Sequence, residues 1–170
     1  MLEAWMLSTV LGALRGRLAG PDAFFNGVSI DSRRIEPGQL FVALSGARFD
    51  GHDYLEQVAA KSAAAALVER EQEEVELPQL VVADTRLALG QLGALNRAAF
   101  RGRVAAVTGS SGKTTVKEML ASILRADHGG DAAAVLATRG NLNNDLGVPL
   151  TLLELAPQHR SAVIELGANH

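Results

Sequence analysis

One short stretch constrains the fold of this chain more than any other. Ala105-Ala106-Val107 is an apolar run that leads into Thr108-Gly109-Ser110-Ser111-Gly112, and Lys113-Thr114-Thr115 follow directly. A strand that ends in a glycine-rich turn and then opens a helix forms a phosphate-binding loop, because the turn and the helix N-terminus direct N–H groups toward an anion. The stretch therefore predicts an α/β fold with a mostly parallel sheet and a phosphate site at one strand end.

The match to the general phosphate-loop pattern is incomplete at one position. That pattern is G-x-x-x-x-G-K-[ST], and Val107 stands where its first glycine would be. The setting still supports the assignment, because apolar residues recur with a helical period after the loop. We expect them to form the buried face of that helix: Val116, Met119, Leu120, Ile123 and Leu124. An ordinary Gly-Ser turn is the alternative, and it does not explain why Lys113 and Thr114 follow directly.

The residues of this loop have separate expected roles. The phosphates of a nucleotide would be held by Gly109, Ser110, Ser111, Gly112, Lys113, Thr114 and Thr115. Lys113 would bring a cation to the β- and γ-phosphates, and the Thr114 hydroxyl is placed to bind Mg²⁺. Glu165 ends the apolar run 161–164, so it is expected at the carboxyl end of a parallel strand as the second metal ligand. The alternative for Glu165 is a side chain that turns into solvent as its strand ends.

Composition excludes several other classes of protein. Hydrophobic residues make up 48% and charged residues 21% of the 170, which predicts a packed core. A net charge of −3 argues against nucleic-acid binding. The sequence has no cysteine, which excludes disulfides and thiolate metal sites and fits a cytoplasmic protein. No apolar run approaches membrane-spanning length, so we expect no membrane insertion.

The pattern of elements predicts two domains joined by a helix. Residues 1–83 are expected to form a small α/β domain, 84–102 a linker helix, and 103–170 a phosphate-loop domain. In the first domain we expect helices at 7–14 (capped by Ser8) and 54–63, strands at 27–30, 40–44, 64–68 and 79–82, and a loop at 45–53. In the second we expect strands at 104–107, 132–137 and 161–167, an amide-rich loop at 138–145, and a helix beginning near Pro149.

Three loop segments carry further candidate binding residues. Ser32 and Arg33 follow a strand and would bind an anionic group, although a solvated turn explains them equally well. The glycine-containing loop at 45–53 would bring backbone and charge to a ligand through Ser45, Gly46, Asp50, Gly51 and His52. The amides of Asn141, Asn143 and Asn144 would donate to phosphate or carboxyl oxygens, or they stand there because asparagine tolerates the left-handed conformations found in loops.

The phosphate loop and two later segments together resemble a known family. Thr-Gly-Ser-Ser-Gly-Lys-Thr-Thr (108–115) is similar to the phosphate loop of the ATP-dependent Mur ligases, which also lack the first glycine of the general pattern. Residues 140–153 and 162–170 resemble the family member that adds D-alanyl-D-alanine to UDP-N-acetylmuramoyl-tripeptide. Segments of the first domain resemble its uridine-nucleotide-binding domain: 28–33, 37–46 and 49–53.

The resemblance implies ATP and Mg²⁺ as cofactors, and UDP-N-acetylmuramoyl-tripeptide and D-Ala-D-Ala as substrates. The implied reaction is a carboxyl phosphorylation followed by amine attack on the acyl phosphate. Lys113 would be the catalytic residue, with Thr114 and Glu165 on Mg²⁺ and Asn141 to Asn144 near the reacting carboxyl. Ser32, Arg33 and the Ser45–His52 segment would hold the UDP part.

The resemblance also implies that this sequence is an N-terminal portion of such a ligase, a monomer when complete. The family's second-metal lysine and histidine, its adenine-binding segment and its C-terminal domain have no counterpart here. We therefore expect the chain to be inactive by itself. The alternatives are another Mur-type ligase, a folate polyglutamate synthase, or a binding module without catalysis. The segment at 140–145 argues against the first two.

Overall fold

The computed structural model describes residues 1–47 and 49–167 as two compact units. One unit is Glu3–Leu92, and the other comprises Met1–Leu2 together with the chain from Gly93 onward. The division falls inside α3 (Thr85–Ala99). The segments 45–53 and 162–170 each include residues outside the described ranges, namely Arg48 and residues 168–170.

The Glu3–Leu92 unit is built on a five-stranded sheet with the order β2-β9-β8-β5-β4. Its strands are β2 (Arg17–Ala19), β4 (Val28–Ser29), β5 (Leu40–Val42), β8 (Ala65–Val68) and β9 (Gln79–Val81). β4, β5, β8 and β9 pair in parallel and only β2 is antiparallel to its neighbour. Two short antiparallel pairs complete the unit: β1 (Trp5–Met6) with β3 (Phe24–Phe25), and β6 (Ser45–Gly46) with β7 (Phe49–Asp50).

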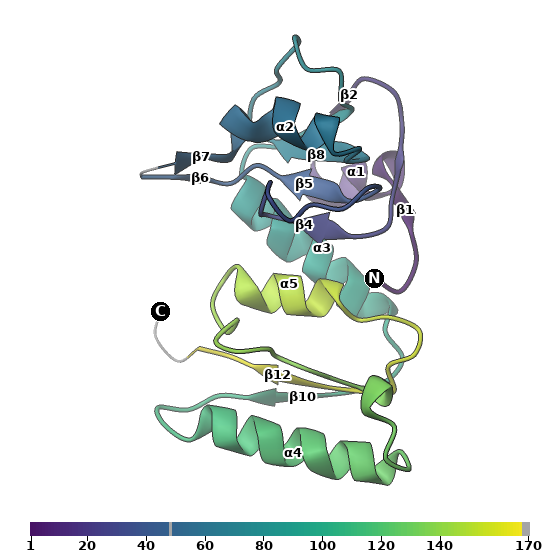
Figure 1. The fold of residues 1–170 in the computed structure, drawn as a ribbon, viewed down its shortest axis with the longest axis vertical. Coiled ribbons are helices and arrows are strands. Elements are labelled where there is room, and N and C mark those ends of the chain that lie inside the picture. The colour runs from purple at the N-terminus through teal and green to yellow at the C-terminus, as the bar shows by residue number, and fades with distance from the viewer. Residues whose placement is uncertain (48, 168–170) are drawn as a thin grey trace. The chain divides into compact units, whose positions relative to one another are not determined.

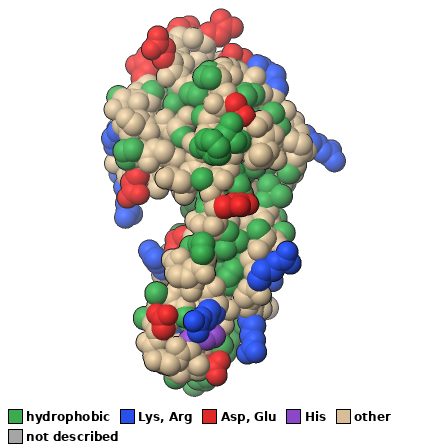
Figure 2. Space-filling view, turned by 90° about the vertical axis from the view of Figure 1, so that its right-hand side faces the viewer, with side chains coloured by type: hydrophobic (Ala, Val, Ile, Leu, Met, Phe, Trp, Pro, Cys, Tyr) green, Lys and Arg blue, Asp and Glu red, His purple; other side chains and the backbone are tan. Residues whose placement is uncertain are grey.

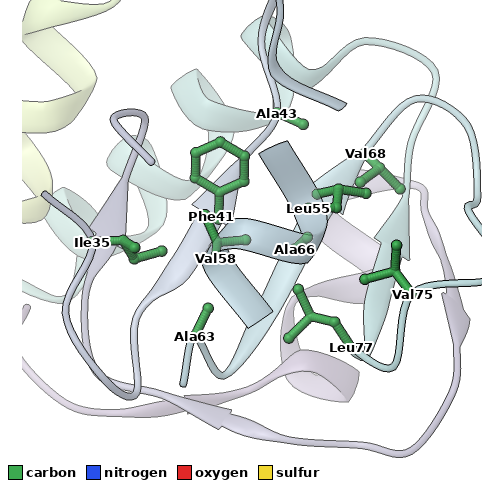
Figure 3. Close-up of a cluster of buried hydrophobic side chains, with 10 residues drawn as sticks. All are labelled: Ile35, Phe41, Ala43, Leu55, Val58, Ala63, Ala66, Val68, Val75 and Leu77. Carbon is green, nitrogen blue, oxygen red and sulfur yellow. The ribbon is translucent and has the colours of Figure 1, made fainter. Parts of the chain in front are cut away.

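The core of this unit lies on both faces of the sheet. α2 (Leu55–Ala60) places Leu55 and Val58 against Phe41 and Ala66 on one face, as Figure 3 shows. Successive side chains of a strand point to opposite faces, so Leu40 and Val42 are buried on the other. That face is covered by α1 (Leu7–Leu14) and the first turns of α3 (Figure 1). A sheet covered on both faces explains why β5 and β8 are continuous apolar runs.

Two local predictions for this unit are wrong. Ser8 does not cap α1, because the helix begins at Leu7 with Met6 at the N-cap. The described residues 45–47 and 49–53 are not one loop, because β6 and β7 pair antiparallel and a 3₁₀ helix, η1 (Gly51–Tyr54), follows them. Gly51 is required there, since a Cβ atom at this residue would lie 2.7 Å from the backbone nitrogen of Leu44. The β6–β7 pair and the short strands β1, β2 and β3 lack clear alternation, so the sequence pattern did not predict them.

The unit that begins at Gly93 contains a three-stranded parallel sheet in the order β10-β12-β11. Its strands are β10 (Arg103–Val107), β11 (Val135–Ala137) and β12 (Ser161–Glu165), with a 3₁₀ helix η2 (Ala132–Ala134) before β11. α4 (Lys113–Asp127) and α5 (Gly147–Leu153) lie on opposite faces of this sheet (Figure 1). The predicted strand at 132–137 is therefore half 3₁₀ helix, with the Asp131 side chain accepting from the Ala133 N–H. The α/β class with mostly parallel sheets is confirmed.

The buried face of α4 differs from the predicted one. Val116, Met119 and Ile123 are 52–62% exposed, whereas Lys117 and Ala121 are buried. The phosphate loop fixes the rotation of the helix, because Thr114 must face the strand ends and residues three and seven positions later share that face. Leu120 and Leu124 lie at the edge of the buried face and pack against Val135 and Val163.

The surface mixes charge types on the face shown in Figure 2, where Lys and Arg side chains are scattered among acidic and apolar ones. Several acidic residues lie in one turn of the Glu3–Leu92 unit: Glu69, Glu71, Glu73, Glu74 and Glu76. None of the helices in the described part of the chain has the length and hydropathy needed to cross a membrane.

Candidate functional site

The turn between β10 and α4 has the backbone geometry of a phosphate cradle. Gly109 and Gly112 have φ angles of 143° and 74°, a region that favours glycine. Gly112 is the N-cap of α4, so the first N–H groups of a 15-residue helix open onto the turn. The Lys113 ammonium donates to the Gly109 carbonyl at 2.8 Å and thereby spans the mouth of the loop. Ser110, Ser111 and Thr115 complete the loop and are exposed.

A buried carboxylate lies beside this loop. β12 pairs with β10 so that Glu165 is level with Val107, the last residue before the turn. Glu165 is only 2% exposed, and its Oε2 accepts from the Thr114 hydroxyl at 3.1 Å. Its Oε1 accepts from the Asn143 amide at 2.8 Å. The structure therefore brings Thr114, Asn143 and Glu165 together, and Glu165 does not turn into solvent.

These donors fit a magnesium ion that shares its coordination with phosphate. Magnesium prefers oxygen ligands and is bound by one or two carboxylates together with substrate phosphates and water. Thr114 and Glu165 supply a hydroxyl and a carboxylate oxygen 3.1 Å apart at the mouth of the loop. Within residues 1–47 and 49–167 there is no group of three or more His, Cys, Asp or Glu that would hold a metal without such help.

Two further residues of this site were not predicted from the sequence. Lys117, one helical turn after Lys113, is 1% exposed, and its ammonium donates to the Thr138 carbonyl at 2.7 Å. The same ammonium lies 4.0 Å from Oε2 of Glu165. The Thr138 hydroxyl accepts from the Glu165 N–H at 2.8 Å. Lys117 could have been identified by its spacing, because a residue three positions after Thr114 lies on the same face of the helix.

The three asparagines of the amide-rich loop have different surroundings. Asn143 alone contacts Glu165, and its carbonyl accepts from the Gly167 N–H. The Asn144 side chain accepts from the Gly147 N–H at 2.8 Å and so satisfies the start of α5. Asn141 is exposed. None of the three asparagines has a positive φ angle, so the left-handed alternative is wrong, whereas Asn143 does donate to a carboxyl oxygen, that of Glu165.

The Glu3–Leu92 unit has a pocket of its own, of about 410 Å³. Three of the residues predicted to bind substrate line this pocket, namely Ser32, Arg33 and Gly51. The rest of its lining is Ile30, Asp31, Phe41, Leu44, Phe49 and Tyr54. The apolar and aromatic side chains give it flat surfaces, and the turn at 31–33 gives it a polar edge. Its described lining does not include Ser45, Gly46, Asp50 or His52.

The polar edge of the pocket is held in place by charge. The Lys61 ammonium donates to the carbonyls of Ser32 and Arg33 at 2.9 and 2.7 Å. The Arg33 guanidinium binds both carboxylate oxygens of Asp31, which lowers the pKa of Asp31 to about 2. Because Arg33 is largely exposed and Asp31 is partly exposed, the pair fixes the shape of the turn more than it stabilises the fold.

The other predicted substrate residues of this unit form an internal network. Oδ2 of Asp50 accepts from Arg70 at 2.5 Å, and its Oδ1 accepts from the ring and backbone of His52 at 2.6 and 3.0 Å. Hydrogen bonding to Arg70 and then to His52 holds the pKa of Asp50 well below its usual range. His52 is fully buried, and its Nε2 accepts from the Glu69 N–H at 3.0 Å, so neither ring nitrogen is presented to a ligand. Ser45 joins the network through Asp50, and Gly46 lies in β6 and is exposed.

Comparison with known proteins gives matches for both units. The Mur ligase family catalytic domain matches residues 25–97, and the Mur ligase middle domain matches residues 107–170. The UDP-N-acetylmuramoyl-tripeptide–D-alanyl-D-alanine ligase of Escherichia coli K12 is 52% identical over 164 residues, which is 96% of this chain and 35% of that protein. The Haemophilus influenzae protein of the same name is 54% identical over 143 residues, covering 84% of this chain and 31% of its own length. The chain thus spans about a third of these relatives.

Solved structures agree with the sequence matches. A crystal structure of MurF from Acinetobacter baumannii has a TM-score of 0.87 and 51% identity, covering 99% of this chain and 37% of that one. MurF from Thermotoga maritima in complex with ADP has a TM-score of 0.74 and 32% identity, covering 85% of this chain and 33% of that one. The phosphate loop, the carboxylate beside it and the matches to both domains lead to one assignment: the chain belongs to the Mur ligase family.

Proposed function

We propose that this chain is the part of an ATP-dependent ligase that binds the nucleotide phosphates and the UDP end of the acceptor substrate. The complete reaction would join D-Ala-D-Ala to UDP-N-acetylmuramoyl-tripeptide, as the names of the relatives state for those proteins. The observation that carries the proposal is the Thr114–Glu165 pair at the mouth of the phosphate loop. We place the protein in the cytoplasm, where ATP is available.

The phosphate loop would position and neutralise the transferring phosphoryl group. Backbone N–H groups of residues 109–115 would hold the β- and γ-phosphates, and the Lys113 ammonium would leave the Gly109 carbonyl for a phosphate oxygen. Thr114 and Glu165 would hold Mg²⁺, which lowers the charge repulsion between the γ-phosphate and the incoming carboxylate. Asn143 donates to Glu165 and would orient the Glu165 carboxylate for the metal ion.

The chemistry of ligation divides into two steps on the substrate. A substrate carboxylate oxygen attacks the γ-phosphorus of ATP. The bond between the γ-phosphorus and the oxygen that bridges it to the β-phosphorus breaks, which gives an acyl phosphate and ADP. The amine of D-Ala-D-Ala then attacks the acyl carbon, loses a proton and expels inorganic phosphate. Water must be excluded between the steps, because it would hydrolyse the acyl phosphate.

The pocket of the Glu3–Leu92 unit suits a uridine nucleotide. Phe49 and Tyr54 are aromatic side chains at its wall, on which a flat base would stack. Ser32 and the backbone of the 31–33 turn offer polar groups to the ribose and diphosphate. Arg33 supplies a cation at the same edge, already turned by its ion pair with Asp31.

The experiment that tests the function is the complete reaction with the full-length protein. UDP-N-acetylmuramoyl-tripeptide, D-Ala-D-Ala and Mg-ATP are supplied, and the pentapeptide product and released phosphate are measured. We expect both products in equal amounts, and neither when D-Ala-D-Ala is omitted. A protein that binds UDP-N-acetylmuramoyl-tripeptide and Mg-ATP but forms no product would instead be a binding module, and the proposal would be wrong.

A further inference from the structure

A buried lysine follows the phosphate-binding lysine by one helical turn, and the proposed reaction does not use it. Lys117 is 1% exposed, although lysine is almost never fully buried without a partner. Its ammonium is 2.7 Å from the Thr138 carbonyl, 3.0 Å from a carboxylate oxygen of Glu118 and 4.0 Å from Oε2 of Glu165. An ion pair between Lys117 and Glu118 could form at the surface and does not explain why Lys117 is buried. The contacts with Thr138, which follows β11, and with Glu165 in β12 are therefore the ones to explain.

Thr138 connects this lysine to the carboxylate. Its carbonyl accepts from Lys117, its hydroxyl accepts from the Glu165 N–H at 2.8 Å, and its own N–H donates to the Val163 carbonyl at 3.0 Å. Lys117 therefore fixes the residue that follows β11, and that residue fixes the backbone of Glu165. The carboxylate itself is then aimed by Thr114 and Asn143.

We propose that Lys117 is a positioning residue that holds the Glu165 carboxylate in place for the divalent cation accompanying the nucleotide. The inference rests on the proposed function, because it assumes that Thr114 and Glu165 bind that cation. It assigns Lys117 no contact with nucleotide or substrate. Partners of a metal ligand that set its orientation commonly change metal affinity by about 10- to 100-fold when removed.

Charge alone would act in the opposite direction. A cation 4.0 Å from a ligand oxygen repels a metal ion, so its removal would tighten metal binding. The Glu118 carboxylate lies closer to Lys117, at 3.0 Å, and offsets part of that repulsion. Loss of Lys117 also leaves the buried Thr138 carbonyl without its donor. We therefore expect loss of position to outweigh relief of repulsion, and metal binding to weaken.

The test separates metal binding from nucleotide binding in the full-length protein. Mn²⁺ replaces Mg²⁺, and its binding with ADP held below the protein concentration is followed by the loss of the free-ion signal in electron paramagnetic resonance, relative to the same mixture without protein. ADP affinity without metal is measured by calorimetry in EDTA. For Lys117→Met we expect Mn²⁺ affinity to fall about tenfold, with ADP affinity in EDTA changed less than about twofold. Lys117→Arg, which keeps the charge and a donor for Thr138, should recover most of the loss.

Two further variants complete the test. Arg125→Met removes a cation two turns along the same helix and should leave both affinities unchanged. Thr138→Val keeps the carbonyl but deletes the hydroxyl that holds Glu165, so it should weaken Mn²⁺ binding even if Lys117→Met does not fold.

The outcomes are distinguishable. Unchanged or tighter Mn²⁺ binding in Lys117→Met or Thr138→Val overturns the positioning role, and so does an equal loss of ADP affinity in EDTA, which indicates general damage to the loop. A wild-type protein that binds no ADP with Mn²⁺ contradicts the proposed function itself, and the role of Lys117 with it.

Discussion

The two units of this chain enclose their sheets to different degrees. In the Glu3–Leu92 unit, β5 and β8 are buried at every residue, and helices cover both faces. In the unit that begins at Gly93, β12 is buried throughout but β10 is exposed or half-buried along its length. Since burial of apolar surface is the main source of stability, we expect the first unit to be the more stable one.

The two candidate binding sites also differ in how far they are enclosed. The pocket at Ser32 and Arg33 is walled by side chains of the covered sheet, and its polar turn is held by Lys61. The phosphate site lies on a loop and on the ends of strands, where N–H groups and charges must stay open to a ligand. A site of the second kind gains its order from hydrogen bonds such as Thr114–Glu165 more than from a surrounding core.

The largest effect that we predict separates the two sites functionally. Lys113→Met removes the cation expected at the transferring phosphate, so ligation should slow by about 10²–10³-fold or more. Its affinity for UDP-N-acetylmuramoyl-tripeptide should stay unchanged, because Ser32 and Arg33 lie in the other unit. Product formation is measured by chromatography and substrate binding by calorimetry. A parallel loss of UDP-substrate affinity would show that the two sites are not independent.

The next largest effect concerns the cost of removing a leucine side chain from the core of each unit. Leu67→Ala in β8, where the leucine is fully buried, should cost about 3 kcal/mol in free energy of unfolding. Leu124→Ala in α4, where the leucine is half-buried, should cost about 1 kcal/mol. Urea unfolding can report the units separately, because the chain's one tryptophan and one tyrosine, Trp5 and Tyr54, both lie in Glu3–Leu92.

Fluorescence of Trp5, which packs edge-on against Phe25, therefore follows one unit, whereas helical circular dichroism follows both. We expect the fluorescence transition at the higher urea concentration. Coincident transitions, or an earlier fluorescence transition, would contradict the ranking of the two units.

Features of the candidate site could be predicted from the sequence where they depend on neighbouring residues, and could not be predicted where they depend on contacts between distant segments. The turn between β10 and α4, and the place of Thr114 and Glu165 beside it, could be predicted because they follow from residue type and strand position. Asn143 was singled out, but nothing in the sequence could tell it from Asn144, since only the fold shows which amide reaches Glu165. His52 was misinterpreted as a possible ligand contact because its burial depends on Asp50 and Glu69.

The rotation of α4 shows why periodicity alone was insufficient. The apolar pattern at Val116, Met119 and Ile123 favoured one face, but the phosphate loop turned the face bearing Thr114 and Lys117 toward the sheet. The contacts of Thr114 and Lys117 with the sheet, and not the apolar pattern, thus decide which face of the helix is buried. Lys117 was not predicted for the same reason, because a lysine within a predicted amphipathic helix is ordinarily assigned to its exposed side.

A smaller effect concerns acid stability of the Glu3–Leu92 unit. The pKa of Asp31 is about 2 in the folded chain, below its ordinary value of about 3.9, because Arg33 binds the carboxylate. A carboxylate with a lowered pKa stabilises the fold above the unfolded-state value, and this contribution is lost as the pH falls from about 4 to about 2. Asp31→Asn should therefore flatten the pH dependence of the Trp5 unfolding midpoint in that window. An unchanged slope would contradict the contribution of the pair.

The smallest expected effect bears on the exposed face of α4. Ile123 is 62% exposed, so Ile123→Gln should change the free energy of unfolding by less than about 0.5 kcal/mol. Ala121→Gln, two residues earlier and fully buried against the sheet, should cost more than about 1 kcal/mol because the larger side chain has no space. Thermal unfolding followed by circular dichroism compares the two. If Ile123→Gln costs as much as Ala121→Gln, the Ile123 face of α4 is covered in the protein, and the contrast between a fully covered sheet and a partly covered one fails.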